Sequence, residues 1–109
     1  MIVLTVMYPN TAGSKFDMDY YINKHMPLVH ERLESSGLKR SAVIKGLQSG
    51  GQGGPAPFQV LTNLYFESAE AMGKGMQAHG KEILGDIANF TDVEPMSQVS
   101  DPVKVTEAA

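Results

Sequence analysis

The chain has 109 residues, no cysteine, and nine basic against twelve acidic side chains, which give a net charge of −3. This length is typical of one domain, so residues 1–109 are predicted to form a single unit. The lack of cysteine excludes disulfides, thiolate catalysis and iron–sulfur clusters, and the lack of a basic block argues against nucleic acid or an anionic membrane as a partner.

The first predicted element is a strand over residues 2–8. This run is almost continuously apolar and rich in branched side chains, and the turn formers Pro9 and Asn10 follow it. It is too short to span a membrane and lacks the basic flank and cleavage pattern of a signal peptide, so a cytoplasmic protein is expected. Tyr8 lies at the strand end, where its side chain either points into a pocket or packs at the rim.

A long helix is predicted between Phe16 and Gly37. Asp17 is the expected N-cap, because its carboxylate can accept the unpaired amides of the first turn. Gly37 can adopt the left-handed conformation that ends a helix. Pro27 has no amide to donate to the carbonyl four residues before it, and its ring crowds that carbonyl. The helix is therefore expected to kink or loosen near His25.

Two rows of side chains run along this predicted helix. One row contains Tyr21 and His25, one turn apart, so a phenol and an imidazole can address the same small volume as donor and as base. Tyr20 is the alternative donor. The other row is an apolar stripe that needs a sheet or a second helix to cover it, and its members are Ile22, Met26, Val29 and Leu33.

A second strand is predicted over residues 38–47, where three basic side chains favour an edge position or a face that reaches solvent. The next stretch, residues 48–57, reads QSGGQGGPAP. Its four glycines and two prolines preclude a regular element. It is predicted to be either a long hairpin connection or a lid.

Residues 58–67 have the clearest strand pattern, because apolar and more polar side chains alternate. The predicted core face consists of Phe58, Val60, Thr62, Leu64 and Phe66. The other face mixes amides and a phenol with one leucine, and it either lines a cavity or is a solvated sheet face. In the first case the substrate-binding candidates on it are Gln59, Asn63 and Tyr65.

A second helix is predicted to begin after its N-cap, Ser68. Each of its glycines costs about 1 kcal/mol relative to alanine, so the helix must be held by packing. A break is expected near Gly80, followed by a short helical piece over residues 81–90. A turn and a final strand over residues 93–100 come next, and Pro95 demands a strand start or an edge. The tail, residues 101–109, is expected to be flexible or to lie across a partner.

Further residues are candidates for the pocket wall. Phe90 is placed to line the mouth, and Met26 belongs to a set of seven methionines that could form a pliable apolar lining, although methionine is more often core filler. Asp86 and Asn89 either line the mouth or, as their residue types favour, shape a turn.

The predicted order of elements is β-α-β-β-α-β. This order defines an α+β, ferredoxin-like antiparallel sheet with helices on one face. The other face is left bare and carries apolar side chains, so a second copy of the chain is the expected cover, giving a two-fold homodimer. A pocket is expected between the helices and the curled sheet of each subunit.

Four stretches carry a family resemblance: VMYPN, FDMDYYINKHMPLV, LYFESAEA and GDIANFTDVEP. In this order, and over nearly the whole chain, they resemble the EthD family. The resemblance implies a dimeric α/β barrel within a wider group of quinone-forming monooxygenases, muconolactone isomerases and polyketide-modifying proteins. The family is named after a component of a bacterial fuel-ether degradation system, and its members are commonly labelled reductases. The glycine-rich residues 48–54 are the one departure from its pattern.

The functional hypothesis centres on His25. An imidazole with an ordinary pKa near ~6.5 can accept and return a proton at neutral pH. With Tyr21 or Tyr20 as donor, His25 is predicted to handle a proton on a small hydrophobic, aromatic or polyketide-like compound. The reaction is an oxidation, isomerisation or dehydration. A structural histidine bonded to a backbone carbonyl is the plainer reading of the same residue.

The alternative function is a non-catalytic accessory subunit that carries or sequesters a hydrophobic catabolite. No phosphate loop or dinucleotide-binding motif is present, so no cofactor is predicted. Redox chemistry would need either no cofactor or a transiently bound flavin or haem. No metal site is predicted either, because the three histidines lack the HExxH spacing of a helical zinc site.

Overall fold

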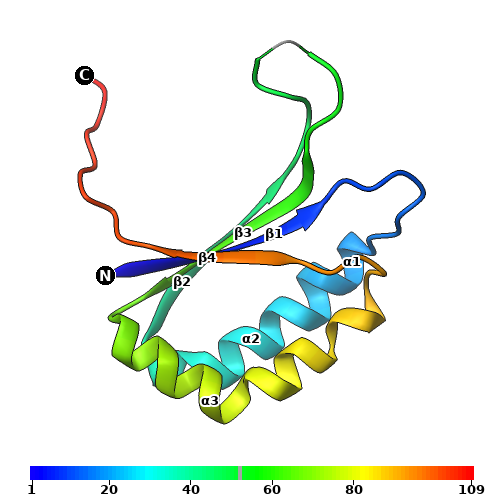
Figure 1. The fold of residues 1–109 in the computed structure, drawn as a ribbon. Helices are drawn as coiled ribbons and strands as arrows, with labels where there is room; N and C mark the ends of the chain where they lie inside the picture. The colour runs from blue at the N-terminus through cyan, green and yellow to red at the C-terminus, as the bar shows by residue number, and fades with distance from the viewer. Residues whose placement is uncertain (52) are drawn as a thin grey trace.

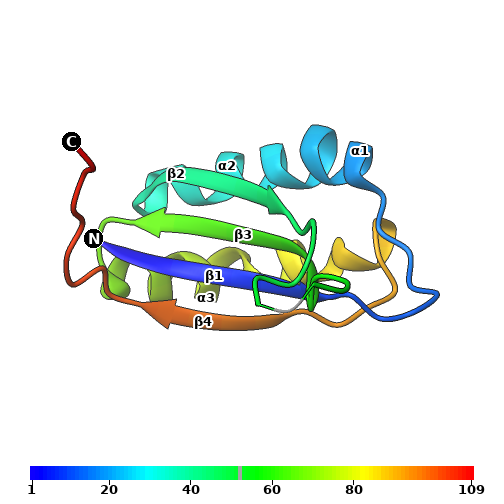
Figure 2. The ribbon, with the colours of Figure 1, turned by 90° about the horizontal axis from the view of Figure 1, so that it is seen from above.

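The computed structural model describes residues 1–51 and 53–109. Its strands are β1 (Ile2–Pro9), β2 (Leu38–Lys45), β3 (Phe58–Phe66) and β4 (Met96–Ser100). They form one antiparallel sheet in the order β2-β3-β1-β4, which Figure 2 shows from above. The helices lie together on one face of this sheet (Figure 1), so the predicted ferredoxin-like α+β fold is confirmed. Within the described ranges, no helix combines the length and apolar character that crossing a bilayer requires.

The first helical region begins and ends where the sequence predicts. It comprises α1 (Met18–Tyr20), the π-helical η1 (Tyr21–His25), α2 (Met26–Leu33) and the 3₁₀-helical η2 (Glu34–Ser36). Asp17 Oδ1 accepts the backbone N–H of Tyr20 at 3.0 Å, which confirms the N-cap. Gly37 ends the region with a φ of 91°, a left-handed conformation that favours glycine.

The predicted irregularity near His25 is a π-helical turn. The amide of Met26 bonds to the carbonyl of Tyr21, five residues earlier, because Pro27 offers no amide to continue the α-helical pattern. The wider turn rotates the residues before it relative to α2. As a result Tyr21 is buried, whereas Ile22 is 49% exposed, so the prediction that Ile22 belongs to the buried stripe was wrong.

The second helix, α3 (Ala69–Gly85), is continuous, so the expected break near Gly80 was wrong. Packing holds it together. A Cβ at Gly75 would lie 2.7 Å from the Cβ of Ser36 in η2, so glycine permits the close approach of the two helical regions. Ser68 Oγ accepts the amide of Ala71 at 3.1 Å, which confirms the N-cap. A short 3₁₀ helix, η3 (Ile87–Asn89), follows.

Two strands are shorter than predicted. β2 ends at Lys45, and its neighbour Gly46 passes so close to β3 that a Cβ there would overlap the carbonyl oxygen of Phe58. β4 begins only after Pro95 and is an edge strand, as that proline requires. The antiparallel neighbours β2 and β3 form a hairpin, and residues 48–51 and 53–57 of its connection lie on the side of the sheet away from the helices (Figure 1). Gln52 in this stretch lies outside the described residues.

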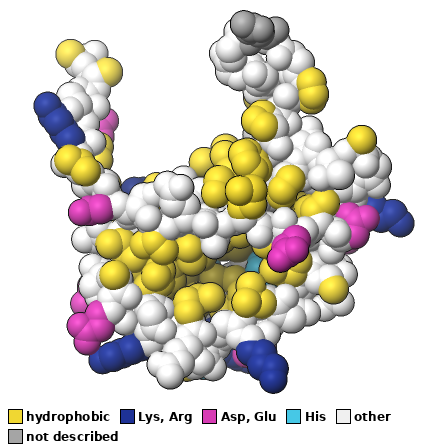
Figure 3. Space-filling model, viewed as in Figure 1, with side chains coloured by type: hydrophobic (Ala, Val, Ile, Leu, Met, Phe, Trp, Pro, Cys, Tyr) yellow, Lys and Arg dark blue, Asp and Glu magenta, His cyan; other side chains and the backbone are white. Residues whose placement is uncertain are grey.

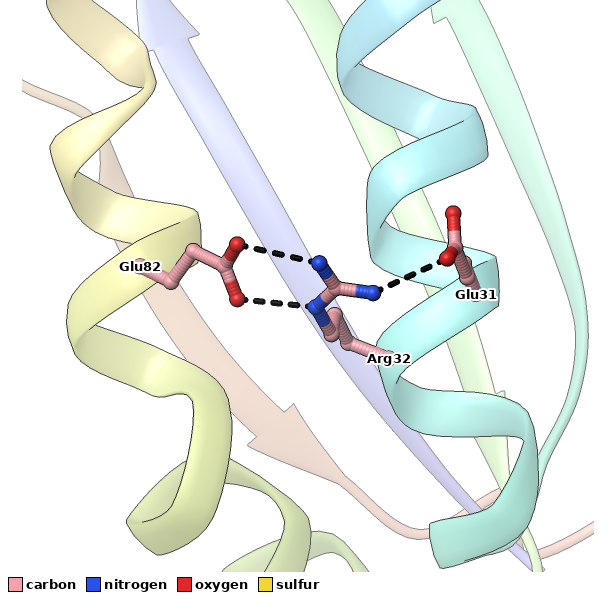
Figure 4. A network of polar contacts seen from close by, with 3 residues as sticks. All are labelled: Glu31, Arg32 and Glu82. Atoms are coloured by element: carbon pink, nitrogen blue, oxygen red, sulfur yellow. Dashed lines mark hydrogen bonds and ion pairs between the residues drawn. The ribbon is translucent and has the colours of Figure 1, made fainter.

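A surface ion pair joins the two long helices. Arg32 of α2 donates from Nε and Nη2 to the carboxylate of Glu82 in α3, at 2.8 and 3.2 Å, and from Nη1 to Glu31 at 3.0 Å (Figure 4). Such a two-pronged contact fixes relative position, while its exposure to solvent keeps its contribution to stability small.

Candidate active site

A cavity of about 160 Å³ lies between the sheet and the helices. Side chains of β1, β3, η1, α2 and α3 form its walls, and η3 and the start of β4 complete it. Figure 3 shows the corresponding hollow between β4 and α3, with apolar side chains around it and a histidine visible inside. The lining residues are Leu4, Val6, Tyr8, Tyr21, His25, Met26, Val29, Leu33, Thr62, Leu64, Met76, Ile83, Leu84, Ile87, Pro95 and Ser97.

Three hydroxyl groups belong to the buried part of this lining. Tyr8, Tyr21 and Thr62 are each no more than 2% exposed. Tyr21 Oη and Thr62 Oγ1 share a hydrogen bond of 2.6 Å in which either can donate. Burial raises the pKa of Tyr8, and the neighbouring Tyr21 adds to that shift; burial also raises the pKa of Tyr21. Both phenols are therefore neutral at pH 7, and each keeps a proton to donate.

The buried His25 pairs with the partly exposed Asp86. The His25 Nδ1 and Asp86 Oδ2 atoms are 2.9 Å apart, and His25 is 4% exposed. The other carboxylate oxygen of Asp86 accepts from Tyr20 Oη at 2.7 Å and from Asn89 Nδ2 at 2.9 Å. Burial raises the pKa of Asp86, but the hydrogen bonds from Asn89, Tyr20 and His25 outweigh it and hold that pKa below its usual range. Asp86 is thus an ionised acceptor at neutral pH.

The protonation of His25 follows from this pairing. Burial lowers the pKa of His25, and Asp86 opposes the shift only in part, so the imidazole is neutral at pH 7. Because a carboxylate can only accept, the single ring proton resides on Nδ1. Nε2 then carries a lone pair, and within residues 1–51 and 53–109 it has no hydrogen-bond partner. A basic nitrogen on the cavity wall is therefore left available.

Local structure holds the imidazole in place. The π-helical turn stacks the Tyr21 ring on the His25 ring, with 5.2 Å between centroids, and Phe90 packs against His25 at 4.7 Å. The segment that carries Asp86 and Phe90 is tied to the start of the helix, because the amide of Asp17 donates to the carbonyl of Phe90 at 2.7 Å. Residues far apart in the chain are thereby fixed around one ring.

The structure brings together some of the predicted site residues. Tyr8, Tyr21, His25 and Met26 all line the cavity. Tyr20 lies off the cavity and donates to Asp86, so it acts on His25 only through that carboxylate. Phe90 supports the imidazole from behind and is not part of the cavity lining.

The other three candidates do not meet this cavity. Gln59, Asn63 and Tyr65 alternate with the buried residues of β3 and so lie on the sheet face away from the helices. Gln59 donates to the carbonyl of Pro9, Asn63 accepts from Thr5, and Tyr65 stacks under Arg40 at 4.0 Å. A compound in the cavity would not reach them, which corrects the interpretation that their face of β3 lines the pocket beside His25.

Two residues of the candidate site, Asp86 and Thr62, were not predicted from the sequence as site residues. Asp86 was expected to shape a turn or line the mouth, whereas it is the carboxylate partner of His25. No local pattern joins two residues 61 positions apart. Thr62 could have been identified from the sequence, because it is the one polar residue among the apolar side chains on the core face of β3. Within the described ranges, no group of three or more histidine, aspartate or glutamate side chains is arranged to hold a metal ion.

Comparison with known proteins assigns the chain to a family. The model of the EthD domain matches residues 12–94. The chain belongs to the EthD family. An EthD-like protein from Ralstonia eutropha JMP134 is similar to this EthD protein, with 44% identity over 94% of this chain and 92% of that one, and a TM-score of 0.87.

More distant structures share the fold alone. An ethyl tert-butyl ether D (EthD) family protein from Bacillus halodurans C-125 has 18% identity and a TM-score of 0.63, over 93% of this chain and 97% of that one. An antibiotic biosynthesis monooxygenase has 12% identity and a TM-score of 0.50, over 95% and 100%. No curated protein matches the chain significantly.

Proposed function

We propose that this EthD protein is a small enzyme that transfers a proton on an uncharged aromatic or enolisable compound held in the cavity. The observation that carries the proposal is the neutral imidazole of His25, which is bonded to Asp86 at 2.9 Å, lines the cavity, and has no partner for Nε2 among the residues that the structure describes. This combination supplies a base, a group that orients it and a binding space.

The proposed reaction begins when a substrate O–H or acidic C–H gives its proton to His25 Nε2. The imidazolium that forms is stabilised by the Asp86 carboxylate, which already holds Nδ1. The negative charge left on the substrate is stabilised by hydroxyl donors of Tyr21 and Tyr8, which stay protonated. His25 then returns the proton to another atom, which completes an isomerisation or assists a dehydration.

An oxidoreductase version starts with the same proton transfer. The substrate carbanion would then combine with dioxygen as the co-reactant and take up a proton to form a hydroperoxide, and loss of water from it would leave one oxygen atom in the product as a carbonyl. A similar structure carries the name antibiotic biosynthesis monooxygenase, and that name supports this version. Proton removal is common to all of these outcomes, so the test is aimed at that step.

The experiment measures hydrogen–deuterium exchange into neutral single-ring enolisable ketones, such as cyclohexanone and cyclopentanone, in D₂O by NMR. The wild-type protein is expected to accelerate exchange next to the carbonyl, and His25→Gln is expected to abolish the acceleration. His30→Gln is the matched control, because His30 lies on the same helical region and does not line the cavity. Equal acceleration by His25→Gln and the wild type would reject the proposal.

A non-catalytic carrier is the second candidate, and the predominantly apolar cavity lining favours it. A carrier binds the same ketones without accelerating exchange, and its affinity does not change in His25→Gln. The exchange assay combined with a binding titration therefore separates the two functions.

We also propose that the protein is a homodimer whose sheets face each other. On the face away from the helices, one apolar row crosses all four strands: Ile44 pairs with Leu61, Leu61 with Met7, and Met7 with Met96. Ile44 and Met96 are 46% and 55% exposed, so the described residues of one chain leave both ends of the row uncovered. Light scattering at micromolar concentration is expected to give twice the 11.8 kDa chain mass, and Ile44→Asp should weaken the dimer. A wild-type monomer would contradict this arrangement.

A further inference from the structure

We propose that the compound bound beside His25 is a neutral molecule with a single-ring polar head inside the cavity and an apolar substituent that lies on a shelf outside its mouth. The shelf is an open groove beside the cavity, formed by Leu84, Ile87, Ala88, Thr91, Asp92, Val93, Glu94 and Pro95. This inference rests on the proposed function, because it assumes that the reacting compound occupies the cavity.

The size of the cavity limits the head group. An apolar cavity of about 150 Å³ admits benzene, and the cavity beside His25 has about 160 Å³. A single ring with a small polar substituent therefore fills it. Two fused rings with substituents exceed this volume, so the remainder of a larger molecule must lie outside.

The position of the buried polar groups determines which end of the compound enters the cavity first. The polar groups beside His25 are buried: His25, Tyr8, Tyr21 and Thr62 are each at most 4% exposed. The lining residues that face solvent are Leu84, which is 59% exposed, and Ser97. The hydroxyl or carbonyl of the ring must therefore enter first to reach His25 Nε2. Any substituent on the opposite side of the ring is left at the mouth.

The shelf continues directly from the mouth. Leu84, Ile87 and Pro95 line both the cavity and the shelf, so a chain that leaves the cavity along these three residues stays in contact with apolar side chains. Val93 extends the apolar surface further. The exposed Leu84 gains a covering contact when a substituent lies on it.

Charge excludes anionic compounds. The described lining of the cavity contains no lysine or arginine, and neither does that of the shelf, which carries the carboxylates of Asp92 and Glu94. A carboxylated or phosphorylated compound would lose its hydration in the cavity without meeting a cation, and would pass two like charges at the mouth. The bound compound is accordingly neutral.

The test is a binding series of phenol and the neutral 4-alkylphenols from methyl to hexyl, with affinity measured by calorimetry and location by the NMR shifts of His25. Affinity is expected to rise about two- to fourfold per methylene, the upper value being that of a fully buried group. Leu84→Ala should flatten this rise. Ile22→Ala removes another exposed aliphatic side chain, 49% exposed against 59% for Leu84, that lines neither groove, and it should leave the rise unchanged.

The exclusion of anions from the cavity is tested with a second pair of compounds. 4-Hydroxybenzyl alcohol is expected to bind, and 4-hydroxybenzoate of similar size is expected not to bind at the same concentration. Four results would each overturn the inference. In the first two, the alcohol and the benzoate bind with equal affinity, or the affinity of the alkylphenols does not depend on chain length. In the others, Leu84→Ala and Ile22→Ala show the same dependence on chain length, or no phenol binds.

The outcomes also separate this inference from the proposed function. If affinity does not rise with the length of the alkyl chain but proton exchange still depends on His25, the shelf is not a binding surface and the proposed enzymatic function stands. If the rise of affinity with chain length depends on Leu84 but proton exchange does not depend on His25, the enzymatic function is rejected and the protein is a carrier of neutral alkylated rings.

Discussion

Two histidines on the first helical region differ in what surrounds them. Each has Nδ1 bonded to a carboxylate, His25 to Asp86 at 2.9 Å and His30 to Glu34 at 2.7 Å. His30 Nε2 is also engaged, at 2.7 Å from Ser41 Oγ, and the His30 side chain is 30% exposed. His25 is buried on the cavity wall, and its Nε2 is free of partners in the described part of the chain.

The comparison shows that residue types alone do not define a site. Ser41, His30 and Glu34 form the hydrogen-bonded sequence of a nucleophilic triad, yet neither His30 nor Ser41 lines the cavity. Their bonds tie α2 to the edge strand β2. At His25, by contrast, an ionised partner, a free nitrogen and an enclosed space occur together, and this combination permits chemistry.

Exchanging each histidine for glutamine gives the largest expected contrast. His25→Gln should lower the exchange rate by about 10²- to 10⁴-fold, the usual contribution of a general base. His30→Gln should change it less than about twofold, since its ring does not line the cavity. The NMR exchange assay with cyclohexanone measures both rates. A loss of similar size in the two variants would show that the difference in environment has no catalytic meaning.

Neutralising the two carboxylates gives the next largest contrast. Asp86→Asn should slow exchange by about 10- to 100-fold, because a hydrogen bond to a charged group is worth ~1.5–3 kcal/mol and here it stabilises the imidazolium. Glu34→Gln is the matched change beside His30 and should leave the rate unaltered. If Asp86→Asn retained the full rate, Asp86 would be a structural partner only.

Two glycines test whether the helix packing that brings Asp86 to His25 matters. Gly75→Ala should destabilise the fold by about 1–3 kcal/mol, because the new Cβ would lie 2.7 Å from the Cβ of Ser36. Gly73→Ala meets nothing within 4 Å and should stabilise the helix by about 0.5–1 kcal/mol. Urea unfolding measures both changes, and a stabilising Gly75→Ala would refute the close approach.

The pH dependence of stability gives the smallest expected effect. Because burial depresses the pKa of His25 in the folded state, its contribution to stability is complete above the unfolded pKa near ~6.5 and is lost as the pH falls through the folded value. Wild type should therefore lose more stability than His25→Gln between pH 7 and 5, by at most ~1.4 kcal/mol per pH unit. Parallel urea midpoints for the two proteins would contradict a depressed pKa.

Local features of the fold were predictable from the sequence, whereas contacts between distant segments were not. The caps at Asp17 and Gly37 and the irregular turn before Pro27 depend on neighbours within a few residues, so the sequence indicates them directly. The continuity of α3 past Gly80 was mispredicted because Gly75 and Gly80 are both buried in the folded chain, where packing outweighs the low helix propensity of glycine.

The site could be predicted only in part for the same reason. Tyr21 and His25 are one turn apart, so their shared volume follows from helix geometry. Asp86 is 61 residues from His25, and only the folded chain brings them together. Which face of β3 meets the cavity depends on where the helices pack, and alternation alone does not contain that information.

The central claim is that His25 is a neutral base with its proton on Nδ1 and a free Nε2 facing the cavity. Nitrogen-15 NMR of the imidazole across pH 4–8 measures the pKa and the tautomer together, with His25→Gln to assign the signals. The predicted result is a pKa below 6.5, an Nδ1–H tautomer at pH 7, and an Nε2 shift that moves when phenol is added. A pKa at or above 6.5, or a proton on Nε2 at pH 7, would contradict it.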